Sequence, residues 1–318
     1  MDINYKQLLF GLATYIPGVY GRFSRTGGTD SARYCYTVWL RHIVVAYANG
    51  LLTGLPHDVA ELGPGDSMGI GLAALISGVD TYHAFDVVPF SDGRRNLTIF
   101  DELVSLFQRR ENIPDQDEYP LVGPRLQSYV FPAQILTEAW LANALASTRL
   151  RSIRDSLVHL IETRGQTPSI TYVTPWNDLA RLAPSSVDMI YSQAVLEHVN
   201  DLEVVYRTFY QWLRPGGVMS HDIDFTSHGI TKKWNGHWVL SNRVWKLVRG
   251  NRPYLLNRQP YSEHVKLIRR HGFDIVREMK VTDNTGVARP ALALEFSGLT
   301  DDDLVTASVS VQAVKKPA

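Results

Sequence analysis

A glycine-rich turn between an apolar strand and a helix constrains this chain more than any other segment. Residues 58–62 are apolar enough for a short buried strand, and Gly63 and Gly65 permit backbone angles and close approaches that a Cβ would obstruct. Asp66 or Ser67 can cap the helix that follows. Open α/β sheets bind nucleotide-like ligands at such turns, beyond the carboxyl end of a parallel strand. The segment therefore predicts a cofactor site in a sheet of this kind.

Two acids and two absent motifs narrow the choice of ligand. The third glycine of G-x-G-x-x-G is missing and no Lys-Ser or Lys-Thr pair follows, so a dinucleotide fingerprint is incomplete and a P-loop is excluded. Glu61 precedes the turn, where an acid would repel a pyrophosphate but could attract a cation. Asp86 ends the next strand, residues 81–87, and can accept hydrogen bonds from both ribose hydroxyls. We therefore expect S-adenosylmethionine as the cofactor, with a nicotinamide dinucleotide as the less suitable alternative.

Motifs further along the chain agree with this choice. The ordered set is the glycine turn, Asp86 after the second strand, an Asp188…Ser192…Leu-Glu-His segment, and Leu-Arg-Pro-Gly-Gly at 213–217. This set resembles class I S-adenosylmethionine-dependent methyltransferases over residues 57–100 and 168–281. The resemblance implies an α/β fold with a Rossmann-like, seven-stranded, mostly parallel sheet. It also implies one antiparallel strand at the sheet edge, which we expect over 307–314.

The same resemblance implies a set of cofactor contacts. They are Glu61 at the methionine end, Gly63 and Gly65 in the turn, Asp86 on the ribose, and Ser192. Where the family usually has an acid after the third strand, this chain has Trp176, which we expect to stack on the adenine ring. Asn177 or Asp178 would then bond the adenine amine.

Composition fits an enzyme with one sizeable core. The chain has 318 residues, 45% of them hydrophobic, and 32 basic residues balance 32 acidic ones. This balance gives no basic field for nucleic acid, which argues against a nucleic-acid partner. The single cysteine, Cys35, excludes an internal disulfide and suits a cytoplasmic location. No segment has the length and apolarity of a transmembrane span.

We expect the methyltransferase domain to occupy 57–318, behind a helical amino-terminal extension over 1–56. Residues 101–110 fit a crossover helix, and a mostly helical insertion over 111–165, broken near Ser147, follows as a lid or a dimer contact. A second insertion covers 283–306. The apolar start, residues 8–20, fits a helix packed on the body or on a second copy, or alternatively an interfacial patch that approaches a lipid-linked substrate.

The densest polar cluster follows the fifth strand and includes His221, Asp222, Asp224 and His228. A histidine there can serve as general base for a hydroxyl because its pKa lies near neutral pH, and His221 and His228 are the candidates. Asp222, Asp224 and His228 could instead hold a divalent metal, or the histidines could satisfy loop backbone groups.

A narrower resemblance concerns the acceptor. Ser-His-Asp-Ile-Asp at 220–224 and Gly-Gly-Thr-Asp-Ser-Ala-Arg at 27–33 are similar to bacterial methyltransferase-like proteins associated with cell-surface polysaccharide assembly. This resemblance implies O-methylation of a sugar or glycan hydroxyl. The alternatives are methylation of a small molecule or lipid at nitrogen or carbon, and a catalytically silent binding protein with the same fold.

Overall fold

The computed structural model describes residues 4–16, 28–87, 91, 93–163, 166–176, 181–252 and 254–316. The strands are β1 (Asp58–Leu62), β2 (Thr81–Phe85), β3 (Ile170–Val173), β4 (Val187–Gln193), β5 (Leu213–Asp224), β6 (Phe273–Thr282) and β7 (Thr306–Lys315). The α-helices are α1 (Tyr5–Ala13), α2 (Ala32–Ala48), α3 (Gly69–Ser77), α4 (Gly93–Gln108), α5 (Glu138–Ala144), α6 (Ser147–Thr163), α7 (Leu202–Trp212), α8 (Asn242–Arg249), α9 (Tyr261–Arg270) and α10 (Asp301–Val305). Short 3-10 turns are η3 (Leu196–His198), η4 (Gly236–Val239), η5 (Arg289–Ala291) and η6 (Leu294–Phe296).

The seven strands form one sheet in the order β3-β2-β1-β4-β5-β7-β6. Strands β1 to β5 pair in parallel, and β7 runs antiparallel to both β5 and β6. The expected Rossmann-like, mostly parallel sheet is confirmed. The antiparallel strand lies one place in from the edge, however, and β6 is the edge strand. The reason is that β7 is buried along nearly its whole length, so its alternating sequence did not mark a solvent-facing side.

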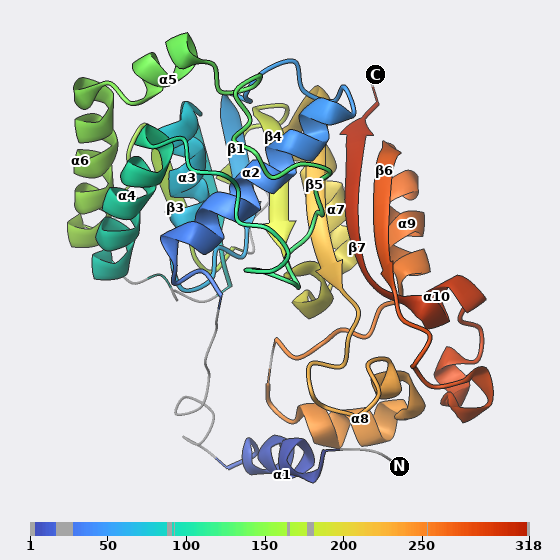
Figure 1. The fold of residues 1–318 in the computed structure, drawn as a ribbon. Helices are drawn as coiled ribbons and strands as arrows, with labels where there is room; N and C mark the ends of the chain where they lie inside the picture. The colour runs from blue at the N-terminus through green and yellow to red at the C-terminus, as the bar shows by residue number, and fades with distance from the viewer. Residues whose placement is uncertain are drawn as a thin grey trace.

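Helices cover both faces of the sheet (Figure 1). One core forms where α2, α3 and α4 meet the sheet, around side chains such as Trp39 and Phe107. The other core forms beneath α7 and α9, around Phe209 and Trp212. Parallel strands buried on both faces leave their carboxyl ends as the natural place for a site.

Helices α1 and α8 lie beyond the carboxyl ends of β4 and β5 (Figure 1). The two helices touch closely, because a Cβ on Gly11 would stand 2.1 Å from the carbonyl oxygen of Val248. Thr14 Oγ1 also accepts a hydrogen bond from the Asn251 N–H at 2.8 Å. The amino-terminal helix thus packs on the body of the protein. Its exposed Tyr5 and Leu9 keep the interfacial alternative as a prediction.

The insertion is largely as expected. Helix α4 begins at Gly93, earlier than the expected residue 101. Residues 111–132 contain no helix or strand, and the helical part breaks before Ser147 into α5 and α6. No helix among the described residues combines the length and the apolarity that crossing a bilayer needs. The domain boundaries and the lid role stay predictions.

Candidate active site

The glycine turn after β1 has the geometry that its sequence predicts. Gly63 and Gly65 adopt φ values of 68° and 73°, in the left-handed region that favours glycine. The Gly63 N–H donates to the carbonyl oxygen of Phe85 at 2.8 Å. A Cβ on Gly63 would stand 2.6 Å from the side chain of Val195. The turn is therefore held between the end of β2 and the segment after β4.

Residues just before α2 fasten this turn from outside. Thr29 Oγ1 donates to the carbonyl oxygen of Pro64 at 2.9 Å and accepts from the Ser67 N–H at 3.0 Å. The expected helix cap is wrong, because α3 starts after Met68, whose side chain makes no capping bond. Ser67 Oγ accepts instead from the N–H of Gly69 at 3.1 Å. The Ser67 hydroxyl also donates to the carbonyl oxygen of Thr29, so Ser67 links the turn to the segment before α2.

Glu61 lies beneath the turn and is only 1% exposed. Its carboxylate accepts hydrogen bonds from the hydroxyls of Tyr82 at 2.6 Å and Tyr191 at 3.3 Å. Burial outweighs these bonds and raises the pKa of Glu61 to about 8. The negative charge that the sequence suggested is therefore mostly absent at neutral pH in the free protein. A cationic ligand above the turn would favour its return.

Asp86 stands beside the glycine turn, directly after β2, and is 4% exposed. Its Oδ1 accepts from the N–H of Val87 at 2.7 Å, and its carbonyl accepts from the N–H of Trp176 at 2.9 Å. The indole of Trp176 packs near Phe85 and Trp212, with ring centroids 6.1 and 5.9 Å away. The structure thus brings Asp86, Trp176 and the glycine turn together at the carboxyl ends of the strands. Asn177 lies outside the described residues.

Ser192 and His221 form a separate, interior pair. Ser192 Oγ and His221 Nδ1 share a hydrogen bond of 2.8 Å, and both residues are fully buried. The His221 ring stacks on Phe209 with centroids 5.0 Å apart. Burial lowers the pKa of His221 to about 3. This geometry does not fit a base that exchanges protons with an acceptor. Alternation along β5 predicts which face of the strand His221 lies on, but it does not reveal that His221 is fully buried.

His228 lies in the loop after β5 and is partly open to solvent, with 31% of its side chain exposed. Its Nε2 lies 3.1 Å from Oδ2 of Asp224, which makes a histidine–carboxylate pair at the carboxyl edge. Burial raises the pKa of Asp224, but the bonds from His228 and Thr226 outweigh it and lower that pKa below its usual value. Asp222 does not join this pair, because it is bonded to Gln193 at 2.9 Å and to Ser310. The metal set Asp222, Asp224 and His228 is therefore not brought together.

Glu197 and His198, in η3, served in the sequence analysis as part of the Leu-Glu-His motif but were not among the expected site residues. Glu197 is 3% exposed, and burial raises its pKa well above the usual range. Nearby backbone N–H groups, none of them in hydrogen-bond geometry with its carboxylate, offset only part of this rise. Burial, and then the neighbouring His228, lower the pKa of His198 to about 4. The rings of His198 and His228 stand 5.1 Å apart. The available signal was the Glu-His pair placed directly after a parallel strand.

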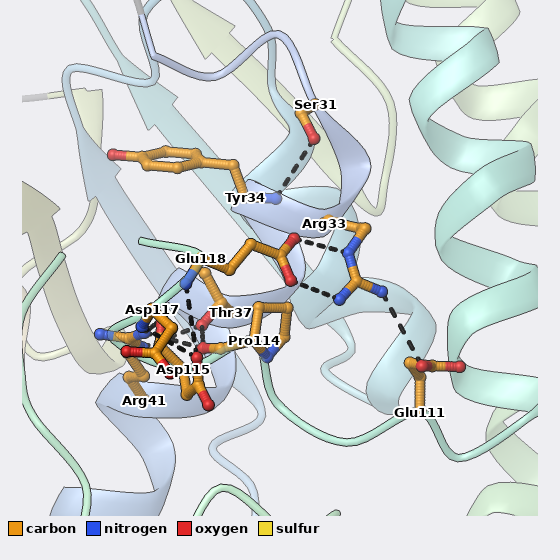
Figure 2. Close-up of polar contacts among 10 residues, drawn as sticks. All are labelled: Ser31, Arg33, Tyr34, Thr37, Arg41, Glu111, Pro114, Asp115, Asp117 and Glu118. Atoms are coloured by element: carbon orange, nitrogen blue, oxygen red, sulfur yellow. Dashed lines mark hydrogen bonds and ion pairs between the residues drawn. The ribbon is translucent and has the colours of Figure 1, made fainter. Parts of the chain in front are cut away.

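Arg41 is a second residue whose role the sequence did not reveal. It is fully buried in α2 and donates to the carbonyl oxygens of Pro114 at 2.7 Å, Asp115 at 3.0 Å, and Val122. Burial lowers its pKa from the usual value. Arg33, about two helical turns earlier, makes two bonds of 2.7 and 2.6 Å to Glu118, so it also holds the insertion (Figure 2). We call residues 114–122 the strap.

The strap and the sheet enclose a hollow of about 320 Å³. Its polar lining comes from the strap side and from β5, β6 and β7: Arg125, Asp222, Lys280, Thr282, Ser308 and Ser310. Burial raises the pKa of Asp222 to about 6. The hollow offers hydroxyl, carboxyl and ammonium groups to a polar molecule.

Residues 137–220 match the family model described as a methyltransferase domain. No curated protein matches the chain. Among solved structures, an S-adenosylmethionine-dependent methyltransferase from Mesorhizobium loti is similar at 18% identity and a TM-score of 0.40, over 85% of this chain and 96% of that one. A phosphoethanolamine N-methyltransferase 2 from Haemonchus contortus gives 14% and 0.43, over 98% and 57%. The YcgJ protein from Bacillus subtilis gives 10% and 0.41, over 87% and 100%.

Similarities to solved structures at these identities and scores carry no functional argument. The family match covers α5 to the middle of β5 and leaves out the glycine turn. The matched strands β3, β4 and β5 belong to the same sheet as β1 and β2. Residues 137–220 are thus similar to a methyltransferase domain, and they form part of a Rossmann-like sheet.

Proposed function

We propose that this domain transfers the methyl group of S-adenosylmethionine to a hydroxyl of a sugar or glycan. One observation carries the proposal: the glycine turn, Asp86 and the pair His228–Asp224 all follow the carboxyl ends of strands in one sheet. Gly63 and Gly65 would lie against the cofactor, and Asp86 would bind the ribose hydroxyls. Glu61 beneath the turn would regain its charge when the cationic methionine end binds.

The reaction asks little of the protein beyond alignment and proton removal. Methyl transfer is an in-line displacement, in which the acceptor oxygen forms a bond to carbon while the carbon–sulfur bond breaks. The sulfonium supplies the driving force, so the protein positions the acceptor. An alcohol must also lose its proton, and His228, which is held by Asp224, would accept it.

Two surfaces support the acceptor class. The hollow beneath the strap is lined by hydroxyl and charged groups, which suits a polyhydroxylated molecule better than an apolar one. Helix α1 exposes Tyr5, Leu9 and Leu12 at 72%, 65% and 41%. These side chains recur at three- and four-residue spacing on the helix that lies beyond the carboxyl edge. A lipid carrier attached to the sugar could rest there.

The test begins with mass spectrometry of the nucleoside that co-purifies, and with calorimetry of S-adenosylmethionine binding. Acceptor screening with activated sugars and glycan fragments follows. We expect His228→Gln to lower kcat by about 10²–10⁴-fold without weakening cofactor binding. His57→Gln is the control, because His57 also pairs with an aspartate, Asp80, at 2.8 Å but lies at the opposite edge of the sheet. An unchanged rate in His228→Gln would contradict hydroxyl activation and favour a nitrogen or carbon acceptor. Absence of cofactor binding would refute the methyltransferase reaction itself.

A further inference from the structure

Glu197, His198 and His228 gather in space although they come from two separate loops. One potential ligand atom from each lies within 4.8 Å of the others. Glu197 and His198 belong to η3 after β4, and His228 follows β5, so both segments leave the carboxyl edge side by side. Among the described residues, this is the group that brings three such side chains together.

The cluster contains buried polar atoms that have no hydrogen-bond partner in the protein. Glu197 is buried, yet neither of its carboxylate oxygens makes a hydrogen bond, and Nδ1 of His198 makes none either. Buried polar groups are normally hydrogen-bonded, and buried charges are paired or coordinate metals. A partner for these atoms has to offer hydrogen-bond donors or positive charge, and a cation that accepts lone pairs from the carboxylate and the imidazole does so.

Surrounding groups hold these side chains in place. Asp224 accepts from Nε2 of His228 at 3.1 Å, and the backbone at Tyr254 bonds to the His198 ring. The Asn257 side chain donates to the carbonyl oxygens of Leu196 at 2.7 Å and Val199 at 2.8 Å, which pins η3. Carboxylates and backbone carbonyls that orient histidines are the usual supports of a metal site.

We propose that Glu197, His198 and His228 bind one divalent transition-metal cation, such as Zn²⁺ or Mn²⁺. Two imidazoles and one carboxylate suit cations of this class. Ligand bonds of about 2.1 Å hold donor atoms no more than about 4.2 Å apart, so small side-chain rotations would close the site. Three protein ligands leave a coordination position open, as in catalytic rather than structural sites.

The site lies next to the proposed cofactor crevice. Val195, two residues before Glu197, packs against the glycine turn, where a Cβ on Gly63 would meet it. Burial, and then the charge of Asp86, raise the pKa of Tyr254, whose backbone bonds to the His198 ring. A cation here could bind the acceptor oxygen and lower its pKa. The hydroxyl proton would pass to solvent, the oxygen lone pair would form the bond to methyl, and the carbon–sulfur electron pair would return to sulfur.

This catalytic role rests on the proposed function, but the binding of the cation does not. In the cation-bound state His228 is a ligand, and the cation rather than its ring activates the hydroxyl. The closing experiment therefore measures binding directly. Protein stripped with a chelator is titrated with Co²⁺, followed by visible absorption, and metal content is counted by mass spectrometry after Zn²⁺ loading.

We expect one equivalent of metal, a Co²⁺ absorption spectrum, and at least about tenfold weaker binding in Glu197→Gln and His228→Gln. The control His57→Gln should bind like the wild type, because its histidine–aspartate pair lies at the other edge. Failure of the folded wild type to bind Co²⁺, or unchanged affinity in both ligand variants, would overturn the site. Circular dichroism confirms that each variant is folded, and the wild-type titration decides even if one is not.

Calorimetry of S-adenosylmethionine on the same stripped samples separates the two proposals. Cofactor binding without any metal site would leave the methyltransferase proposal standing and remove the cation. Metal binding without cofactor binding would do the reverse.

Discussion

The amino-terminal and the carboxyl ends of the parallel strands form two opposite edges of the sheet, and charged groups are paired differently at each. At the amino-terminal edge, Arg214 bridges Asp188 and Asp58, the latter at 2.8 Å, and backbone N–H groups donate to Asp188 at 2.9 Å. At the carboxyl edge, Glu197 is buried with no hydrogen bond. The first edge is built to be complete in the free protein. The second edge holds groups that cost stability until something binds, which is how a ligand site differs from a structural one.

The largest effect that sharpens this comparison concerns Glu61. Its pKa rises from 4.5 to about 8 on folding, so the native state holds a proton that the unfolded state loses. Stability should therefore fall as pH rises through this window, by about 1.4 kcal/mol per pH unit at most and about 5 kcal/mol in total. Glu61→Gln should abolish that slope, and its stability advantage over the wild type should grow from pH 5 to pH 8. Urea unfolding at several pH values measures this, and parallel curves for the two proteins would contradict it.

A second change tests the glycine turn. Gly63→Ala places a Cβ against Val195 and forces a left-handed residue, so we expect affinity for S-adenosylmethionine to fall by about a hundredfold, or about 2.7 kcal/mol. The matched control is Gly50→Ala, where φ is 70° but no atom lies within 4 Å of the new Cβ. Calorimetry should show normal binding in the control despite its similar backbone strain. Equal losses in both variants would mean that strain alone explains the result.

A third pair of variants removes one acid from each edge. Asp58→Asn should lower the free energy of unfolding by about 1 kcal/mol, because it weakens the contacts with Arg214 and Thr81. Glu197→Gln should raise it by about 1 kcal/mol in metal-free protein at neutral pH, because burial makes the folded protein hold a proton on Glu197 that the unfolded chain releases, and an amide carries no such cost. Thermal unfolding of chelator-treated protein compares them. Destabilisation by both changes would break the contrast between the edges.

The smallest effect is expected for Arg214→Gln. Its side chain is 41% exposed, and ion pairs at such positions contribute about 0–1 kcal/mol. The melting temperature should fall slightly, and more at low salt than at high salt. Cofactor affinity, measured by calorimetry, should not change, because the bridge lies at the far edge. A lost cofactor affinity would show that the two edges are coupled.

The sequence predicted local structure well where the pattern was local. The turn at Gly63 and Gly65, the strands and the break before Ser147 follow from short runs of residues, and all three are seen. It failed where the deciding partner lay far along the chain. The role of Arg41 has no local signal, because the strap carbonyl oxygens that it bonds lie more than seventy residues away along the chain.

The same limit applies to the site. His221 and His228 looked equivalent as bases, and only the packing of Phe209 on one and the openness of the other separate them. Glu197 and His198 could be recognised as possible metal ligands only in the fold, where the loop after β5 places His228 beside them. Asp86 was predictable because its position depends on one strand and one turn.

The Arg41 anchor has a consequence for anyone who wishes to alter acceptor preference. One guanidinium bonds the strap at both of its ends, through the carbonyl oxygens of Pro114 and Val122. The wall of the hollow is therefore anchored at two points and is not a free loop. A longer strap between those two carbonyl groups should change the shape of the hollow while both hydrogen bonds from Arg41 remain. Replacing Arg41 would instead remove the hydrogen bonds at both ends of the strap together.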